Sequence, residues 1–411
     1  MRKRELLAGL TTFFTMSYIL VVNPAILSAA GMPKEGVVFA TAVSAAVATF
    51  LMGVYADLPF ALAPGMGLNA YFAYTVCGQM GISWKTALAA VFLEGLIFLA
   101  LTLFGARRAI FRSMPRSLSY GISAGIGLFI ALIGLRNAKI VVSSKSTLVQ
   151  LGSLKTPQAF ITLLTLIFIG VLVKRGVKGS LLLGILFATL LAYFFGLVHL
   201  PHHFFGFPAP TAAFKLNFSD LFSFSIVPVI TAFLLVDLFD TVGTLSALCT
   251  RLGIELHDER VGRALTCDAV GTTVGGLLGT STVTTYVESA SGVAAGGRTG
   301  LTAVTVAFLF LLSLFLYPLI GAVPEFATSA VLIFVGYFMM ESLKKIEWGE
   351  LTEALPAFVT FVSIPLTFSI SDGMGLGFIT YVALKVLTGK LKDLNYIILL
   401  IAAIFFAKFF L

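Results

Sequence analysis

The residues of this sequence best suited to chemistry are carboxylates inside apolar segments. Asp240 and Glu288 each lie within such a segment, the first beside Gly243 and the second beside the small residues of 289–292. A carboxylate at the centre of a bilayer costs about 2.5–3.5 kcal/mol, so it is expected to have a function or a partner. Because no basic residue accompanies these acids, we expect them to accept N–H groups of a neutral ligand, or to bind a cation or a transported proton.

Three further carboxylates lie in apolar segments. Asp237, Asp268 and Glu94 fit hydrogen bonds between helices as well as they fit a functional role. Asp237 and Asp240 are three residues apart, which predicts that they share one helix face.

Glu288 belongs to an unusual segment, residues 279–297, with the sequence GTSTVTTYVESASGVAAGG. Thr280 to Val287 is mostly β-branched and predicts an extended strand, whereas the small residues from Ser289 onward predict a helix. A span that is half strand and half helix leaves backbone groups unpaired, which is tolerated only where it lines a cavity or is buried in protein. The segment is therefore a candidate binding site, to which Tyr286 adds an aromatic ring.

A second broken segment lies near the start of the chain. Residues 57–69 contain two prolines and two glycines within ten positions, which predicts an extended lead followed by a helix from about Asn69 to Val76. Two half-helices would then begin near the membrane midplane, with free N–H groups and positive dipole ends facing a ligand. Tyr71 and Phe72 follow the break and could stack on a flat ligand.

The composition places these segments in a membrane protein. The chain has 411 residues, of which 58% are hydrophobic and 11% charged, and a mean hydropathy of +1.02. A soluble protein could not bury so much apolar surface, so the net charge of +8 reflects loops at a membrane and no nucleic-acid partner is expected. The three scattered cysteines predict neither disulfides nor a metal site. We find no enzyme signature and expect no cofactor.

The expected fold is an all-α polytopic membrane protein of fourteen spans, arranged as two inverted seven-span repeats with short strands in the broken spans 3 and 10. An odd number of spans per half forces the halves into opposite orientations, as in many secondary transporters. A further apolar tail, 394–411, is left open as a span or an interfacial segment. The spans are placed at 8–29, 36–56, 58–76, 82–104, 117–135, 157–173, 180–198, 225–249, 262–278, 279–296, 299–320, 325–341, 354–370 and 373–388.

The loops predict the orientation. With the N-terminus inside the cell, 19 of the 27 Lys and Arg residues fall on the cytoplasmic side, including Arg107, Arg108 and Arg112. This bias agrees with the positive-inside rule. An offset of 219 residues between the halves superimposes the two broken spans and places Asn69 on Glu288.

Several stretches carry a resemblance to a known family. The chain resembles the nucleobase cation symporter family that includes the uracil permease, and within it the AzgA-like purine permeases. The matching stretches cover essentially the whole chain, and the long one around Glu288 is the most specific. They are FFTMSYILVVNPAIL, APGMGLNAYFAY, VDLFDTVGTL, CDAVGTTVGGLLGTSTVTTYVESASGVAAGGRTGLTA and LPAFVTFVSIPLTFSISDG.

The resemblance implies a core domain that binds the base and a gate domain that supports its movement. These would be residues 1–110 and 216–322 for the core, and 111–215 and 323–411 for the gate. It also implies that Asp240 matches the family's acid in span eight, although Thr244 stands where the uracil permease has a histidine.

In the tenth span, Glu288 matches the family's acid and the backbone N–H of Val287 is expected to contact the base. A backbone contact of span three falls near Gly67 or Leu68. Asn69 has no close match in the uracil transporters, which is consistent with a larger or differently decorated base.

We therefore expect a multi-pass symporter of the cytoplasmic membrane that imports a purine (adenine, guanine or hypoxanthine) with protons, exchanged by Asp240 or Glu288. The expected partners are the base, protons and the lipid bilayer, and a homodimer is allowed for. The alternatives left open are uracil or xanthine as substrate, a small anion, and sodium coupling. The substrate-binding residues expected are Glu288, Asp240, Val287, Tyr286, Gly67, Leu68, Asn69 and Phe72.

Overall fold

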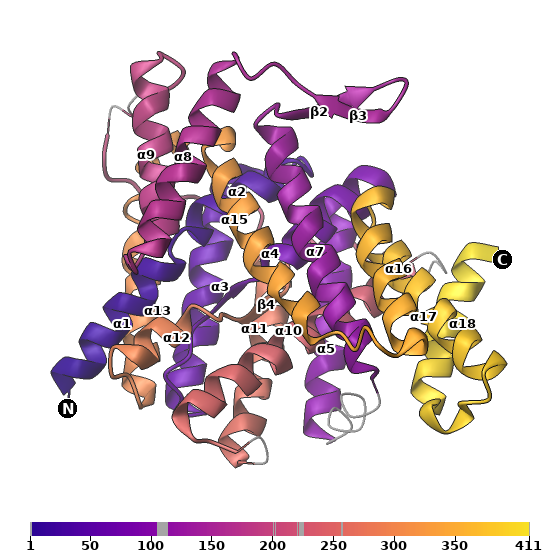
Figure 1. Cartoon of the computed structure of the whole chain (residues 1–411). Coiled ribbons are helices and arrows are strands. Elements are labelled where there is room, and N and C mark those ends of the chain that lie inside the picture. Colours follow the sequence, from indigo (N-terminus) through magenta and orange to yellow (C-terminus); the bar gives the residue numbers. More distant parts are fainter. Residues whose placement is uncertain are drawn as a thin grey trace.

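The computed structural model describes residues 2–104, 114–199, 201, 203–219, 221, 226–255 and 258–410 and is mostly helical (Figure 1). Within these residues, eight helices are long and apolar enough to cross a membrane, and four shorter apolar helices have 10–17 residues. The expected all-α membrane fold is confirmed, while the count of fourteen spans stays a prediction. Arg107, Arg108 and Arg112 lie outside the described residues.

The first half of the chain contains two interruptions. The first expected span is two helices, which are separated at Ser17 and Tyr18, and the third is a strand followed by a helix that continues as a π-helix. The elements are α1 (Arg2–Met16), α2 (Ile19–Ser28), α3 (Lys34–Val54), β1 (Leu62–Pro64), α4 (Met66–Ala70), η1 (Tyr71–Gln79), α5 (Trp84–Leu103), α7 (Arg116–Asn137), β2 (Val141–Ser144), β3 (Leu148–Leu151), α8 (Pro157–Lys174) and α9 (Ser180–Phe194).

The second half has one broken span and short 3-10 turns beside α15. Its elements are α10 (Val227–Leu252), α11 (Glu259–Leu278), β4 (Val283–Thr285), α12 (Ser289–Ala294), α13 (Gly300–Ser313), α14 (Tyr317–Ala322), η3 (Glu325–Thr328), α15 (Ser329–Met339), η4 (Met340–Lys345), α16 (Leu351–Thr367), α17 (Ile370–Leu387), η5 (Leu391–Asp393) and α18 (Tyr396–Phe410).

The two broken segments meet as an antiparallel pair. Strand β1 pairs with β4 in the register Leu62↔Thr285 and Pro64↔Val283, which joins the halves of the chain at the centre of the fold. The pair is short because β4 covers only three of the eight residues expected to be extended. The strands correspond at an offset of 221 residues, and the helices that follow them, α4 and α12, at 223.

Two threonines complete the hydrogen bonding of this pair. The hydroxyl of Thr49 accepts from the N–H of Leu62 at 2.9 Å and donates to its carbonyl at 3.0 Å. Thr272 does the same for Val283, at 3.2 Å and 3.0 Å. A two-stranded ribbon has outer backbone groups without a neighbouring strand, and in a membrane protein they must be satisfied internally. Helices α3 and α11 supply the missing partners.

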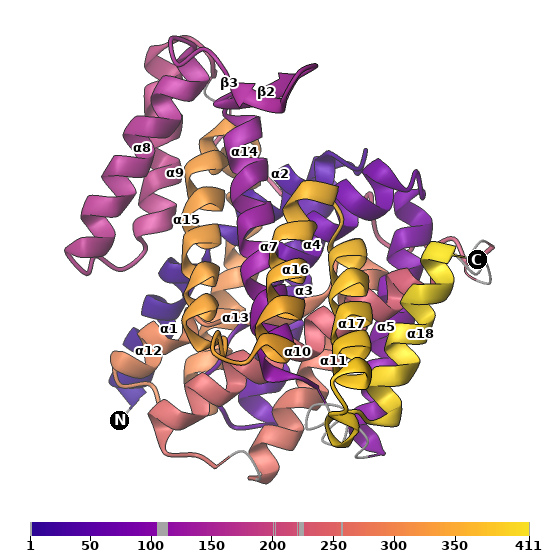
Figure 2. The same ribbon diagram turned by 45° about the vertical axis from the view of Figure 1, so that its right-hand side comes forward.

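The helices pack in two groups. Helix α3 contacts α13 and α11, and α5 contacts α11 and α10, whereas α7 contacts α15 and α16, and α16 contacts α17. Figure 2 shows α15, α7, α16 and α17 in one row, with α8 and α9 beside α15. We call α1–α5 with α10–α13 the first helix group, and α7–α9 with α15–α17 the second.

Glycines allow α11 to approach its neighbours closely. A Cβ atom on Gly276 would lie 2.8 Å from the backbone nitrogen of Phe92 in α5, and one on Gly271 would lie 2.7 Å from the Cβ of Ala48 in α3. The small-residue stretch GTTVGG, residues 271–276 of α11, is therefore a helix-packing surface.

Helix α10 is continuous through Gly243, so Asp240 projects from an unbroken helix. One expectation about the helices is wrong. The helix of the third span begins at Met66 rather than Asn69, because Pro64 and Gly65 end the extended lead. Gly65 and Glu288 therefore occupy equivalent positions, each directly before its half-helix. The expected correspondence of Asn69 with Glu288 is replaced by this one.

Candidate functional site

Glu288 lies where β4 turns into α12. Its carboxylate accepts a hydrogen bond of 2.6 Å from the hydroxyl of Tyr18. Tyr18 is fully buried at the break between α1 and α2, so a second interrupted segment supports the acid. Tyr18 is not among the residues expected from the sequence, because its position in the chain does not reveal its partner.

Asp240 lies on α10 beside the first half-helix. Its side chain is exposed although it is in the middle of a long helix. A Cβ atom on Gly65 would lie 3.9 Å from the carboxylate of Asp240 and 2.8 Å from Cγ2 of Thr284, so glycine here keeps the backbone close to the acid. Asp240 and Glu288 are near enough to interact electrostatically. The two acids predicted to form the site are therefore brought together.

Backbone donors accompany the acids. The N–H groups of Met66, Gly67 and Leu68 open helix α4, and the first intrahelical bond is donated by Asn69 to the carbonyl of Gly65 at 2.8 Å. The N–H of Val287 has no hydrogen-bond partner within the described part of the chain, and its side chain is 57% exposed. The arrangement offers acceptors and donors to the same ligand.

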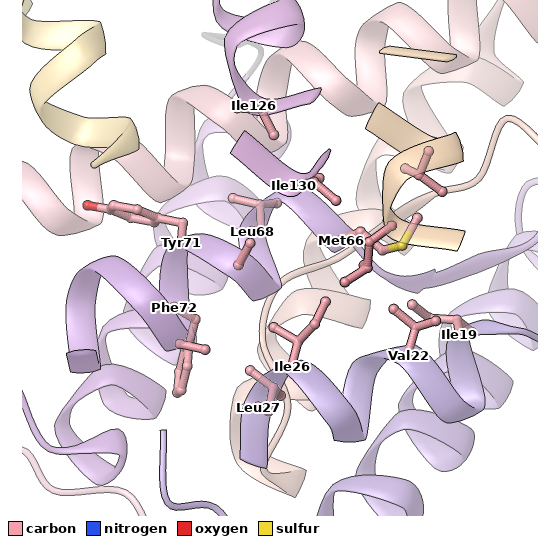
Figure 3. Packing of buried hydrophobic residues seen from close by; sticks show 14 of the residues in the cluster. Ile19, Val22, Ile26, Leu27, Met66, Leu68, Tyr71, Phe72, Ile126 and Ile130 are labelled. Carbon is pink, nitrogen blue, oxygen red and sulfur yellow. The ribbon is translucent and has the colours of Figure 1, made fainter. Parts of the chain in front are cut away.

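Three residues that were expected to bind the substrate have buried side chains that support the surrounding structure. Tyr286 is 6% exposed and uses its hydroxyl to donate to the carbonyl of Pro64 at 2.6 Å. Asn69 is buried and accepts a hydrogen bond from Ser281. Phe72 is fully buried in the hydrophobic core, and Figure 3 shows its ring in the same part of the core as Leu27. The expectation that Phe72 stacks on a ligand does not agree with this burial.

Leu68 also belongs to the core. It is 1% exposed, and Figure 3 shows it close to Ile126 and Ile130 of α7. A Cβ atom on Gly67 would come within 2.6 Å of Ile126, so α4 rests directly on α7. Gly67 and Leu68 can therefore offer a ligand their backbone N–H groups, while their side-chain positions fix the half-helix.

A buried polar network lies behind Asp240. The hydroxyl of Thr241 donates to Asp268 at 2.6 Å and lies 2.8 Å from the hydroxyl of Thr284 on β4. It is also 3.3 Å from Asp237, which points into the protein while Asp240 is exposed. Asp237 and Asp268 therefore belong to a hydrogen-bond network that connects α10, α11 and β4. Hydrogen bonding between helices was one of the two interpretations that the sequence left open.

Exposure along α10 marks a route to the site. The exposed residues Asp240, Gly243, Ala247 and Thr250 recur every three to four positions, so they form one stripe toward the C-terminal end of the helix. No residue from Pro228 to Phe239 is exposed. Figure 1 shows the connection from α10 to α11 at the same end of the molecule as the N-terminus. The acids are therefore accessible from that end.

The site combines carboxylate acceptors with backbone N–H donors. In the described residues no group of three or more His, Cys, Asp or Glu side chains could hold a metal ion. Within the described part of the chain, no lysine or arginine forms a hydrogen bond with either acid. The buried Lys385 pairs with Glu353 and Asp393, at 2.8 Å and 2.7 Å.

Comparisons with known proteins show which family the chain belongs to. Residues 3–376 match the model of a family described as "Permease family". The chain is 51% identical to a putative permease of Methanocaldococcus jannaschii, with 99% of this chain and 94% of the relative covered. It is 43% identical to the guanine/hypoxanthine permease PbuO of Bacillus subtilis (100% and 97% covered) and 42% identical to the adenine permease AdeQ of Escherichia coli (100% and 93% covered).

Solved structures share the fold at low identity. The transmembrane domain of a cyanobacterial bicarbonate transporter, BicA, matches with a TM-score of 0.68 at 17% identity, covering 90% of this chain and 96% of that one. The murine anion transporter Slc26a9 matches with a TM-score of 0.68 at 12% identity, covering 94% and 68%. These likenesses confirm the membrane-transporter fold that the hydropathy pattern and the two broken segments predicted.

Proposed function

Because the chain belongs to the Permease family, a group of membrane transporters rather than enzymes, we propose that it imports purine nucleobases together with protons across the cytoplasmic membrane. Relatives that cover nearly its full length are named guanine/hypoxanthine and adenine permeases, which supports a purine as the substrate. The N-terminus is cytoplasmic in this proposal, as the distribution of basic residues favours.

The observation that carries the proposal is the meeting of Asp240 and Glu288 beside unpaired backbone donors. A purine presents ring N–H groups and ring nitrogens on one flat edge. The carboxylates accept from its N–H groups, and the N–H groups of Val287 and of the first turn of α4 donate to its ring nitrogens or carbonyl. Binding to a charged acceptor is the stronger type of hydrogen bond, so the acids dominate the affinity.

Asp240 is the acid that exchanges the transported proton in this proposal. It is exposed along the stripe of α10, whereas Glu288 is held by Tyr18. Glu288 is then a fixed anchor for the base, and Asp240 can be protonated from the accessible end. The acids therefore differ in role because their surroundings differ.

Transport requires the site to open toward both sides of the membrane. We assign the first helix group to a core domain (1–110 and 216–322) and the second to a gate domain (111–215 and 323–411), which move against each other. At the end opposite the N-terminus, Thr75 and Gln79 of η1 donate to the carbonyls of Phe368 and Thr367 at 3.0 Å and 3.2 Å. These bonds hold the two domains together in the state described and would break when the site opens there.

Binding of a labelled purine to purified protein tests the site. Glu288→Gln and Asp240→Asn remove one acceptor charge each while keeping the shape, and Glu341→Gln, on an exposed helix end, is the matched control. Each site variant should bind about tenfold or more weakly, because a hydrogen bond to a charged group contributes about 1.5–3 kcal/mol. Wild-type affinity in both site variants would refute the assignment.

Uptake into proteoliposomes tests the substrate and the coupling ion. A panel of bases should compete with labelled purine, with adenine, guanine and hypoxanthine ahead of uracil and xanthine. Accumulation should require a pH gradient and persist without sodium. The fold shared with a bicarbonate transporter favours a small anion as a second candidate. The two carboxylates at the site would repel an anion, which argues against this candidate. Bicarbonate-dependent flux would favour it.

A further inference from the structure

A β-hairpin projects from the molecule between α7 and α8. Strands β2 and β3 pair in the register Val141↔Leu151 and Ser144↔Leu148, and Figures 1 and 2 show the hairpin extending beyond the helices, at the end opposite the N-terminus. The helices before and after it, α7 and α8, are both candidate membrane spans. The hairpin is therefore at the level where these helices leave the bilayer.

The hairpin exposes apolar side chains. Leu148 is 82% exposed, Leu151 68% and Val149 55%. Because paired residues of an antiparallel ladder share a face, one face carries Val141, Ser143, Val149 and Leu151, and the other carries Val142, Ser144, Leu148 and Gln150. The first face is the more apolar, with one serine against the serine and glutamine of the second. An isolated two-stranded hairpin is marginally stable in water, so an apolar face of this kind calls for a covering surface.

The charge of the same segment indicates what covers it. Residues 138–156 carry three lysines, Lys139, Lys145 and Lys155, all exposed, and no Asp or Glu. Lysines beside exposed apolar residues fit the boundary between acyl chains and headgroups, where the ammonium groups reach lipid phosphates and the apolar side chains enter the bilayer.

The base of the hairpin is fixed to the helices. The N–H of Ile140 donates to the carbonyl of Leu135 at 2.9 Å, and the N–H of Gly152 donates to the carbonyl of Ile140 at 2.8 Å. Ala138 and Ile140 pack with Ala159 at the start of α8. A hairpin held in this way transmits its position at the membrane surface to α7 and α8.

We infer that the hairpin 141–151 is a lipid-binding element that inserts the face of Val149 and Leu151 into the headgroup layer of the bilayer, with Lys145 of its turn and the flanking Lys139 and Lys155 bound to anionic lipids. This site is separate from the proposed base-binding site and does not depend on it. By anchoring the ends of α7 and α8, it gives the second helix group a fixed position in the membrane.

Tryptophan substitution in the full-length protein tests the orientation of the hairpin. Val149→Trp and Gln150→Trp place a reporter on adjacent residues of opposite faces, and the unsubstituted protein supplies the background from Trp84 and Trp348. In liposomes, lipids brominated near the headgroup should quench the reporter at 149, and its emission should be shifted to the blue. Aqueous acrylamide should quench the reporter at 150 more strongly. Equal accessibility of both reporters to acrylamide would overturn the proposal.

Varying the anionic lipid content of the liposomes tests the role of the three lysines. Quenching of the reporter at 149 should be stronger in liposomes with phosphatidylglycerol than in pure phosphatidylcholine, and replacing the three lysines by Gln should abolish this difference. An unchanged difference would refute the role of the lysines. A second copy of the chain is the competing occupant: efficient disulfide crosslinking between copies of Val149→Cys, without quenching by brominated lipid, would replace lipid binding by dimerisation.

Discussion

The hydroxyl of Tyr18 lies 2.6 Å from a carboxylate oxygen of Glu288, across 270 residues of sequence. The bond joins the break between α1 and α2 to the break between β4 and α12. A carboxylate can accept about four hydrogen bonds, so Tyr18 orients the acid and leaves acceptor positions for a ligand. The proposed anchor of the base is therefore held by the first span of the chain.

Tyr18→Phe removes this bond while keeping the ring. Purine affinity should fall about tenfold, because Glu288 loses its orienting donor and a bond to a charged group contributes about 1.5–3 kcal/mol. Equilibrium binding of labelled purine measures the effect. Tyr193→Phe, on the exposed surface of α9, is the matched control and should bind as the unsubstituted protein does. Unchanged or tighter binding by Tyr18→Phe would show that Tyr18 does not prepare the acid.

The sequence predicted the elements better than their contacts. Apolar runs and the prolines and glycines of 57–69 located the spans and the two breaks, since both depend on local backbone chemistry. The neighbours of Asp240 and Glu288 could not be predicted, because Gly65 and Tyr18 approach them only through tertiary packing. Phe72 faces the core instead of a ligand for the same reason, since a ring next to a break can face either.

The threonine partners of the strand pair give a prediction about stability. Thr49→Val leaves the N–H and carbonyl of Leu62 without partners and should destabilise the protein by roughly 2–4 kcal/mol. Thr272→Val should do the same through Val283, whereas Thr→Ser at either position keeps both bonds and most of the stability. Thermal unfolding in detergent measures this, with Thr250→Val on the exposed face of α10 as control. Equal unfolding midpoints for the Val and Ser variants would contradict the account.

An ion pair outside the spans gives a prediction about pH. The ammonium of Lys390, at 2.7 Å, and hydrogen bonds from Thr352 lower the pKa of Glu350 to about 2. A lowered folded-state pKa stabilises the protein fully above the unfolded pKa, which is about 4.3, and this stabilisation is lost as the pH falls toward 2.

Glu350→Gln should therefore lower the unfolding temperature by the same small amount at pH 6 and pH 8, and by less at pH 3.5. Glu341→Gln, in a looser exposed pair of 3.8 Å, is the matched control. A difference that grew on acidification would have the wrong sign for this carboxylate.

The bonds from η1 to the end of α16 give a prediction about access. Phe368 ends α16 with a φ of 56°, and its ring contacts Phe129 and Tyr74, so this residue sits where the two helix groups meet. Replacing Thr75 and Gln79 together by Ala removes two bonds across this contact. With about 1 kcal/mol for each bond, the population open at this end should rise by roughly tenfold or more.

Labelling of Val287→Cys by a membrane-impermeant thiol reagent, in a background without the three native cysteines, reports this access. The cysteine should react from the side of the N-terminus in the parent, and the Thr75/Gln79 double variant should add reaction from the opposite side. Ala at Thr147 and Gln150 of the hairpin makes the same chemical change away from the contact and should leave the labelling as it was. Labelling of the parent from the opposite side alone would reverse the assigned opening, because the exposed stripe of α10 leads toward the N-terminal end.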